Sequence, residues 1–159
     1  MREILFRGKK IDNKEWVQGD YLAPAFEKTP WILPTGEGEE VKVNPETVGQ
    51  YTGLTDKNGN KIFEGDIVEY EHTLTGYYQL EIREDYKPRR SHSCYWNEDK
   101  SKLHYKRNYA VEWKEKEARF ILRNGSDQHD LKRIGLIMHN GKVIGNIHDN
   151  PELMKGGVE

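Results

Sequence analysis

Residues 50–68 read QYTGLTDKNGNKIFEGDIV, and this stretch decides the fold because turn residues and apolar positions are closely interleaved in it. Gly53, Gly59 and Gly65 fall six residues apart, and glycine is favoured where φ must be positive or where two backbones approach closely. The pair Asn58-Gly59 is the preferred centre of a tight hairpin turn in which both central residues have positive φ. Apolar residues follow the turn at Ile62, Ile67 and Val68. The stretch therefore predicts a hairpin and, after it, a buried strand.

Two ligand-binding interpretations compete with this one. A phosphate-binding loop presents consecutive free N–H groups ahead of a helix, whereas the pattern after Gly65 indicates a strand. An EF-hand loop requires Gly at position six and Glu at position twelve. Counting from Asp56, Gly59 is fourth and Glu64 is ninth. The residue order favours turn architecture over either ligand loop.

Glu64 and Asp66 form a close pair of carboxylates within the same stretch. On a strand, residues two apart face the same side, and paired carboxylates can perform acid–base chemistry or bind a metal. The alternative is a structural role, in which Asp66 accepts a backbone hydrogen bond at a tight strand entry. We favour the structural role.

Alternating apolar residues and turn signals dominate the rest of the chain. Strands are expected in pairs at 3–22 and 109–125 and singly at 31–33, 41–44, 76–85 and 141–149. Residues 130–138 suit either a short helix or a strand, and Pro151 should begin one helical turn. We therefore predict a mainly β fold (β-rich α+β), in which short antiparallel strands form a small barrel with little helix.

The apolar and aromatic positions of these strands give a predicted core. Four Trp and nine Tyr supply large buried areas in a chain with 35% hydrophobic residues. The expected core residues are Phe6, Trp16, Val17, Tyr51, Leu54, Ile62, Ile67, Val111, Trp113, Phe120, Leu122, Val143 and Ile147.

Charge and cysteine content exclude several classes of protein. The chain has 25 basic and 27 acidic residues, and its net charge of −2 provides no overall attraction to nucleic acid or membranes. Cys94 is the single cysteine, so an internal disulfide is impossible. The start, MREILFRGKK, turns basic without an apolar leader region, and no apolar run has the length of a membrane span. We expect a cytosolic protein.

Four segments together resemble the YopX family of phage and prophage proteins. They are FRGK near the start, EWVQGD at 15–20, PETVGQYTGLTDKNGNKIFEGDIV at 45–68 and VIGNIHDNPEL at 143–153. The resemblance implies a β-rich, barrel-like fold and an accessory role in a host bacterial cytoplasm, with no catalytic residues to carry over. The length of the chain suits one domain over 1–159, or two subdomains at about 1–49 and 50–159. The part near 77–106 matches nothing in the family pattern and is expected to be an insertion.

Residues 83–107 are the candidate ligand-binding segment. They contain eight basic and four acidic residues, a local excess of four positive charges in a chain with a net negative charge. Tyrosine and tryptophan are interleaved with these charges, and cations beside stacking rings suit phosphate and base. The candidate ligand-binding residues are Arg89, Arg90, Tyr95, Trp96, Lys106 and Arg107. The alternative is a solvated β-excursion whose aromatic residues pack on the body.

The function that we expect is non-enzymatic. A phage accessory protein of this kind would bind and sequester a host factor or an anionic nucleotide signal, as an inhibitor of host defence. One alternative is a small-barrel module that binds nucleic acid, and another is a protein–protein interaction module. A hydrolase using Glu64 and Asp66, or a Cys94 enzyme assisted by His92, is less favoured because the six histidines show no metal-ligand or catalytic spacing. We expect no catalytic residues, no metal, no cofactor, no membrane partner and a homo-oligomer formed through exposed strand edges.

Overall fold

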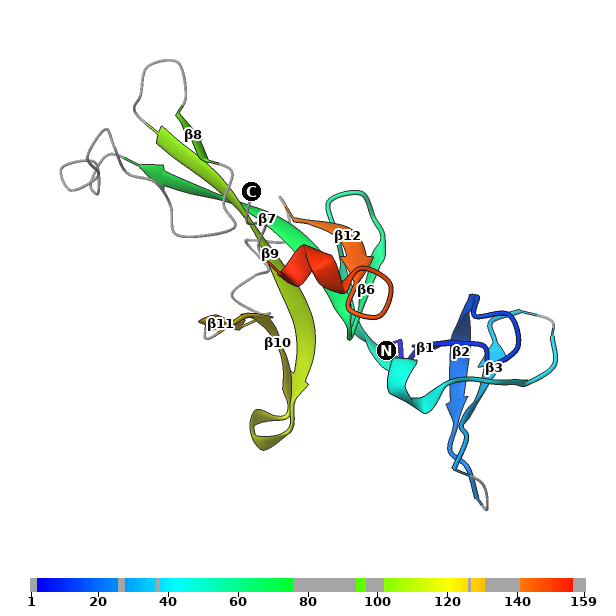
Figure 1. Cartoon of the computed structure of the whole chain (residues 1–159). Helices are drawn as coiled ribbons and strands as arrows, with labels where there is room; N and C mark the ends of the chain where they lie inside the picture. Colours follow the sequence, from blue (N-terminus) through cyan, green and yellow to red (C-terminus); the bar gives the residue numbers. More distant parts are fainter. Residues whose placement is uncertain are drawn as a thin grey trace.

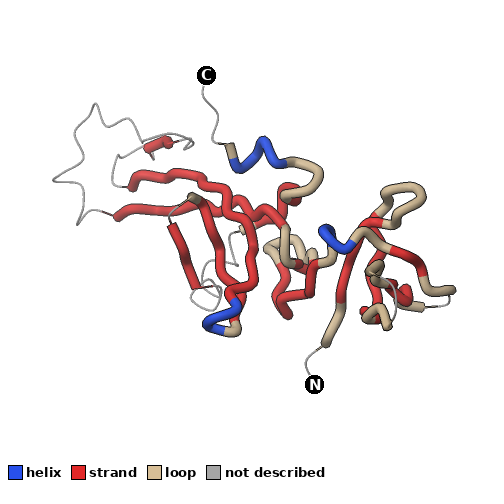
Figure 2. Tube along the Cα trace, turned by 60° about the horizontal axis from the view of Figure 1, so that its bottom comes forward, coloured by secondary structure: helices blue, strands red, loops and turns tan. Residues whose placement is uncertain are grey.

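The structure is a computed structural model of the chain and describes residues 3–25, 28–36, 38–75, 94–96, 102–125, 127–130 and 141–155. These residues form antiparallel strands joined by turns and by short 3-10 helices (Figures 1 and 2). The predicted mainly β fold is therefore confirmed. The predicted barrel is wrong, because the strands form two separate sheets and the first and last strands of each sheet do not pair with each other.

The N-terminal sheet has the strand order β4-β3-β2-β1-β5-β6. Its strands are β1 (Phe6–Lys9), β2 (Trp16–Leu22), β3 (Trp31–Pro34), β4 (Val41–Lys42), β5 (Gly49–Thr55) and β6 (Lys61–Phe63). The 3-10 helix η1 (Pro45–Thr47) follows β4, and the Asn44 side chain accepts a hydrogen bond from the backbone N–H of Glu46 at its start. Proline suits this position because its missing N–H is not needed there.

The C-terminal sheet has the strand order β11-β10-β9-β7-β12, and β8 pairs separately with β9. Its strands are β7 (Asp66–Thr75), β8 (Cys94–Trp96), β9 (Lys102–Lys114), β10 (Arg119–Asn124), β11 (Asp127–Asp130) and β12 (Lys142–Asn146). The 3-10 helix η3 (Glu115–Glu117) joins β9 to β10, and η5 (Pro151–Met154) follows β12, as the proline signal predicts. The expected strand at 76–85 and most of the ambiguous segment 130–138 lie outside the described residues.

The turn between β5 and β6 differs from the expected tight turn. Thr55 pairs with Lys61, so five residues form the loop, and only Gly59 of the central pair has positive φ. The Asp56 carboxylate organises the loop by accepting hydrogen bonds from the backbone N–H groups of Asn58 (2.8 Å) and Asn60 (2.9 Å). An Asp side chain that binds backbone two residues on is a common turn-forming device, and it competes successfully with the two-residue turn.

Among the described residues, the core forms three separate clusters. The largest lies on the C-terminal sheet and consists of Ile62, Val68, Tyr109, Val111, Phe120 and Leu122. A second joins Leu5, Tyr51 and Phe63, and a third joins Val17, Ile32 and Val43 in the N-terminal sheet. Because Ile62 comes from β6, the β5–β6 hairpin contributes to the C-terminal core although it belongs to the N-terminal sheet.

Most of the predicted core residues are confirmed. Val17, Tyr51, Ile62, Ile67, Val111, Phe120 and Leu122 are buried, and Phe6, Trp16, Leu54 and Val143 are partly buried. The prediction of burial is wrong for Trp113 and Ile147, because 41% and 39% of their surfaces are exposed. Trp113 lies opposite Phe120 near the end of the β9–β10 hairpin, where little chain remains to cover it.

Replacing Ile62 with alanine tests the bridging role of the β5–β6 hairpin. Ile62 is completely buried, so Ile62→Ala should lower the free energy of unfolding by about 2–5 kcal/mol. Ile4→Ala is the matched control, because Ile4 is 65% exposed and should change stability by less than about 0.5 kcal/mol. Urea denaturation followed by circular dichroism measures both. Equal effects would contradict the position of Ile62 in the C-terminal core.

Candidate functional site

A dense set of charged contacts lies where β1 meets the start of β7. The Arg7 guanidinium forms an ion pair with the Asp66 carboxylate at 2.6 Å, and only 13% and 1% of the two side chains are exposed. The other Asp66 oxygen accepts a hydrogen bond from the Phe63 backbone N–H at 2.8 Å. Burial raises the pKa of Asp66, while Arg7 and the Phe63 hydrogen bond act in the opposite direction. The expectation that Asp66 accepts a backbone hydrogen bond at a tight strand entry is confirmed.

Aromatic rings hold the Arg7 guanidinium in place. Its central carbon lies 4.7 Å from the centre of the Trp16 ring and 4.9 Å from that of Phe63. One guanidinium nitrogen also donates to the Glu64 carbonyl at 3.3 Å. Cations over ring faces are attracted by the ring quadrupole, and the flat guanidinium also stacks well. Arg7 of the N-terminal sheet is thus fixed against the segment that enters β7.

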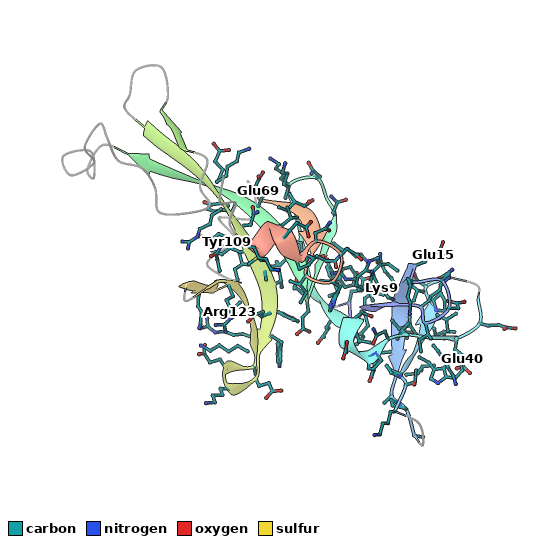
Figure 3. The ribbon with its side chains drawn as sticks, in the orientation of Figure 1. Lys9, Glu15, Glu40, Glu69, Tyr109 and Arg123 are labelled. Carbon is teal, nitrogen blue, oxygen red and sulfur yellow. The ribbon has the colours of Figure 1, made fainter. Side chains whose placement is uncertain are left out.

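A second acidic residue completes this region from the other end of the chain. Asp149, after β12, forms an ion pair with Lys9 and accepts hydrogen bonds from Trp16 Nε1 and Asn146 Nδ2, both at 2.8 Å. Hydrogen bonds from Lys9, Asn146 and Trp16 lower the pKa of Asp149 to about 2. In Figure 3, the labelled Lys9 lies where the two parts of the molecule meet, whereas Glu15 and Glu40 lie farther out on the N-terminal part.

We call this set of residues the sheet junction. Its members are Arg7, Lys9, Trp16, Asp66, Asn146 and Asp149. Asn146 shapes the loop after β12, because its Oδ1 accepts from the backbone N–H groups of His148 (3.0 Å) and Asp149 (2.9 Å). The His148 ring lies 6.1 Å from the Trp16 ring, and partial burial together with Arg7 and Lys9 lowers the pKa of His148.

The carboxylates of Glu64 and Asp66 do not act as a pair. Gly65 between them has a φ of +82°, and β7 begins only at Asp66, so the two carboxylates do not lie on one strand, as the paired acid–base interpretation requires. Burial raises the pKa of Glu64, backbone hydrogen bonds from Trp113 and Gln50 lower it, and nearby Glu112 raises it. Asp66 instead binds Arg7. The two side chains therefore have separate sets of partners.

The side chains of the sheet junction are suited to holding the N-terminal and C-terminal sheets together. Its acidic groups are already neutralised by Arg7 and Lys9, and each also accepts a hydrogen bond from another group of the chain. Among the described residues, no group of three His, Cys, Asp or Glu side chains is placed to hold a metal ion. The described part of the chain also has no helix that is long and apolar enough to cross a membrane.

The predicted ligand-binding residues lie elsewhere, on the C-terminal sheet. Lys106 is 40% exposed and lies 3.7 Å from the Glu69 carboxylate. The next residue, Arg107, packs over the Tyr109 ring at 5.7 Å and lies 3.5 Å from Asn124 Oδ1. Neighbouring residues of a strand face opposite sides, so Lys106 and Arg107 do not share a face of the sheet.

The other predicted ligand-binding residues are described in part or not at all. The backbones of Tyr95 and Trp96 form β8, where they pair with His104 and Leu103 of β9. Arg89 and Arg90 lie outside the described residues. This set of residues therefore stays a prediction.

Sequence reasoning missed the sheet junction as a unit, although it noted the segments that form it. Arg7 and Lys9 come from FRGK, Trp16 from EWVQGD, Asp66 from EGD, and Asn146 and Asp149 from IGNIHDN. The available signal was the presence of basic residues in the first segment and acidic residues in two later ones. The chain is therefore a mainly β protein with two antiparallel sheets. Side chains from segments that are distant in sequence join these sheets.

Comparison with known proteins identifies the family to which the chain belongs. The family model described as YopX protein matches residues 5–155, and the chain belongs to the YopX family. It is similar to the crystal structure of protein EF1440 from Enterococcus faecalis, with 24% identity over 97% of this chain and 99% of that one and a TM-score of 0.48. No curated protein matches the chain.

Arg7 and Asp66 should be strongly coupled in stability. Removing one member of a buried ion pair leaves the other charge without compensation, so Arg7→Met should cost about 3–5 kcal/mol. Asp66→Asn should also destabilise, but the double variant should be more stable than the sum of the two losses predicts, by about 1–3 kcal/mol. Urea denaturation of the four proteins measures this coupling. Additive losses would show that the ion pair contributes nothing beyond its separate side chains.

The Asp149 contacts should give the protein a defined acid sensitivity. Because the folded pKa of about 2 lies below the ordinary value of 3.8, the stabilisation is complete above pH 3.8 and is lost as the pH falls toward 2. With 35% of the side chain exposed, screening limits the contribution to about 1 kcal/mol. Asp149→Asn should therefore be less stable than the parent at pH 7 and nearly equal to it at pH 2.

Urea denaturation midpoints between pH 2 and pH 7 measure this difference. The charge-matched control is Glu152→Gln in the exposed part of η5, which should follow the parent protein at every pH. A difference between Asp149→Asn and the parent that does not change with pH would contradict the assignment to the ionised carboxylate.

Proposed function

We propose that the protein is a non-enzymatic phage accessory protein that binds and sequesters a host ligand in the bacterial cytoplasm, as an inhibitor of host defence. Among ligands, an anionic nucleotide is the one that the residues favour. The observation that carries the proposal is the excess of positive charge and aromatic residues in 83–107. Cations that bind phosphate beside rings that stack on bases are the usual means of nucleotide recognition.

The position of the described part of this segment supports the proposal. Beyond Tyr70, β7 and β9 run side by side away from the N-terminal sheet as a ribbon that we call the β-arm (Figures 1 and 2). The β-arm comprises residues 70–75 of β7 and residues 102–107 of β9, and β8 pairs with β9 toward its outer end. The backbones of Tyr95 and Trp96 are thus attached to the same ribbon as Lys106.

Lys106 can exchange its present partner for a phosphate at little cost. The ion pair with Glu69 is long, at 3.7 Å, and partly exposed, and such pairs contribute about 1 kcal/mol or less. Glu69 also lies 3.2 Å from Lys142 of β12, so its carboxylate keeps a cation if Lys106 turns to a ligand. In Figure 3, the labelled Glu69 projects from the C-terminal sheet near the base of the β-arm.

The sheet junction supports a binding role in preference to a catalytic one. Asp66 and Asp149 are engaged with Arg7 and Lys9 in joining two sheets, and changing their protonation during a reaction would weaken those contacts. A catalytic acid or base needs a pKa near the working pH, so that it can both gain and lose a proton there. The Asp149 pKa of about 2 is far from that range.

Ligand recovery tests the proposal. The protein is purified from phage-infected, defence-activated bacteria and denatured, and the released small molecules are identified by mass spectrometry. A nucleotide should be recovered in stoichiometric amount, and its retention should fall by roughly tenfold or more in Lys106→Glu and in the double variant Arg89→Glu/Arg90→Glu. Lys116→Glu makes the same charge change on the exposed η3 turn and should retain the ligand.

The other outcomes distinguish the alternatives. Retention that is unchanged in the Lys106 and Arg89/Arg90 variants would place the ligand elsewhere. A protein recovered without small molecules would overturn the nucleotide proposal. Binding to DNA or RNA that falls steeply with salt would then favour the nucleic-acid module, because released counterions drive such binding. A co-purified host protein would favour the protein–protein module.

A further inference from the structure

Asn-Gly pairs are the places at which a protein chain most readily modifies itself. The backbone nitrogen of the glycine attacks the asparagine side chain, and glycine has no Cβ to hinder this approach. The sequence contains three such pairs, Asn58-Gly59, Asn124-Gly125 and Asn140-Gly141. The structure describes both residues of the first two pairs, whereas Asn140 lies outside the described residues. The two described pairs differ in how firmly the asparagine side chain is held.

Asn124 is held in place through its side chain. Its Nδ2 donates a hydrogen bond to the Asn108 carbonyl at 2.7 Å, and its Oδ1 accepts one from Arg107 at 3.5 Å. To react, the Asn124 side chain has to turn toward the nitrogen of Gly125, and both contacts with β9 have to break first. The folded structure therefore protects this pair.

Asn58, in the loop between β5 and β6, is held only through its backbone. Its N–H donates to Asp56 Oδ1, while its side chain is exposed and has no hydrogen bond within the described part of the chain. Gly59 has a φ of +83°, and, apart from its chain neighbours, no heavy atom lies within 4 Å of the place where a Cβ would stand. The Gly59 N–H donates to the Asp56 carbonyl at 3.0 Å, but residues 57–60 are exposed and hydrogen bonds in exposed loops open at little cost. The Asn58 side chain can therefore reach the Gly59 nitrogen in the folded protein.

We propose that Asn58 is a self-modification site, at which the folded protein converts this asparagine into isoaspartate. The Gly59 nitrogen gives its proton to solvent and bonds to Asn58 Cγ. The bond between Cγ and Nδ2 then breaks, and Nδ2 takes up a proton from solvent and leaves as ammonia. Water opens the resulting five-membered imide, either at Cγ, which leaves an ordinary aspartate, or at the main-chain carbonyl, which leaves the chain running through the former side chain. The reaction needs only water and does not depend on the ligand proposed above.

The modification acts on the contacts of Asp56, which is 5% exposed. Its Oδ1 binds the N–H groups of Asn58 and Asn60, which lie on either side of the reacting peptide. An isoaspartate lengthens the main chain between these two N–H groups by one carbon, and its new carboxylate repels the Asp56 carboxylate. The other Asp56 oxygen accepts a hydrogen bond from the Val143 N–H of β12 at 3.0 Å. Formation of isoaspartate therefore weakens the attachment of the β5–β6 loop to the C-terminal sheet.

Peptide mapping of stored protein tests the site. The parent protein is kept at mildly alkaline pH, once folded and once unfolded in guanidinium chloride, and isoaspartate in each peptide is quantified by mass spectrometry. In the unfolded chain, Asn58 and Asn124 should react at similar rates, because each precedes a glycine. In the folded protein, Asn58 should react several-fold faster than Asn124. Equal rates at the two positions in the folded protein, or an Asn58 that does not react, would overturn the proposal.

Hydrogen exchange of the stored, folded protein tests the consequence. Exchange of the Val143 N–H should become several-fold faster as isoaspartate accumulates, because this N–H depends on Asp56. Asn58→Gln, stored in the same way, is the matched control: it keeps an amide at an exposed position, but its longer side chain would have to close a less favourable six-membered ring. Its Val143 exchange should not change with storage. Protection of Val143 that survives in protein fully converted to isoaspartate would contradict the proposed release of the loop.

Discussion

The buried ion pair between Arg7 and Asp66 is the interaction on which the arrangement of the two sheets depends. Removing both groups from water is costly, and their attraction repays that cost only when the geometry is good and the remaining polar atoms find partners. Asp66 meets this condition through the Phe63 N–H. Arg7 meets it in part, through the Glu64 carbonyl and two aromatic rings, while its Nε is buried without a hydrogen-bond partner. Neither charge has an equivalent partner if the sheets separate.

The small size of the core clusters explains why such a junction is needed. Among the described residues, each of the two clusters of the N-terminal sheet has only three buried residues. Burying a side chain of this size contributes about 1.5–3 kcal/mol, against an ordering cost of similar size for each residue. The N-terminal sheet therefore depends on contacts with the C-terminal part, and Arg7 and Lys9 supply them from one strand.

Local sequence patterns predict much of the fold, but they do not predict whether the strands close into a barrel. Alternation and turn residues predicted the hairpin within 50–68 and the strand pair at 109–125. The same pattern predicted a barrel, which is wrong because a period of two fixes which residues share a face but not whether the first and last strands meet. Trp113 shows the same limit, since it lies on a strand as predicted but its predicted burial is wrong.

The sheet junction was harder to predict than the fold because its partners are distant in sequence. Nothing near Arg7 identifies Asp66 as its partner, and a single sequence does not show which charged segments meet. Because these charges are paired with one another, they hold the two sheets together. Exchange of protons or ions at the sheet junction would weaken the ion pairs between the sheets. The proposed ligand binding is therefore better placed on the β-arm, where Lys106 can leave Glu69 without disturbing the junction.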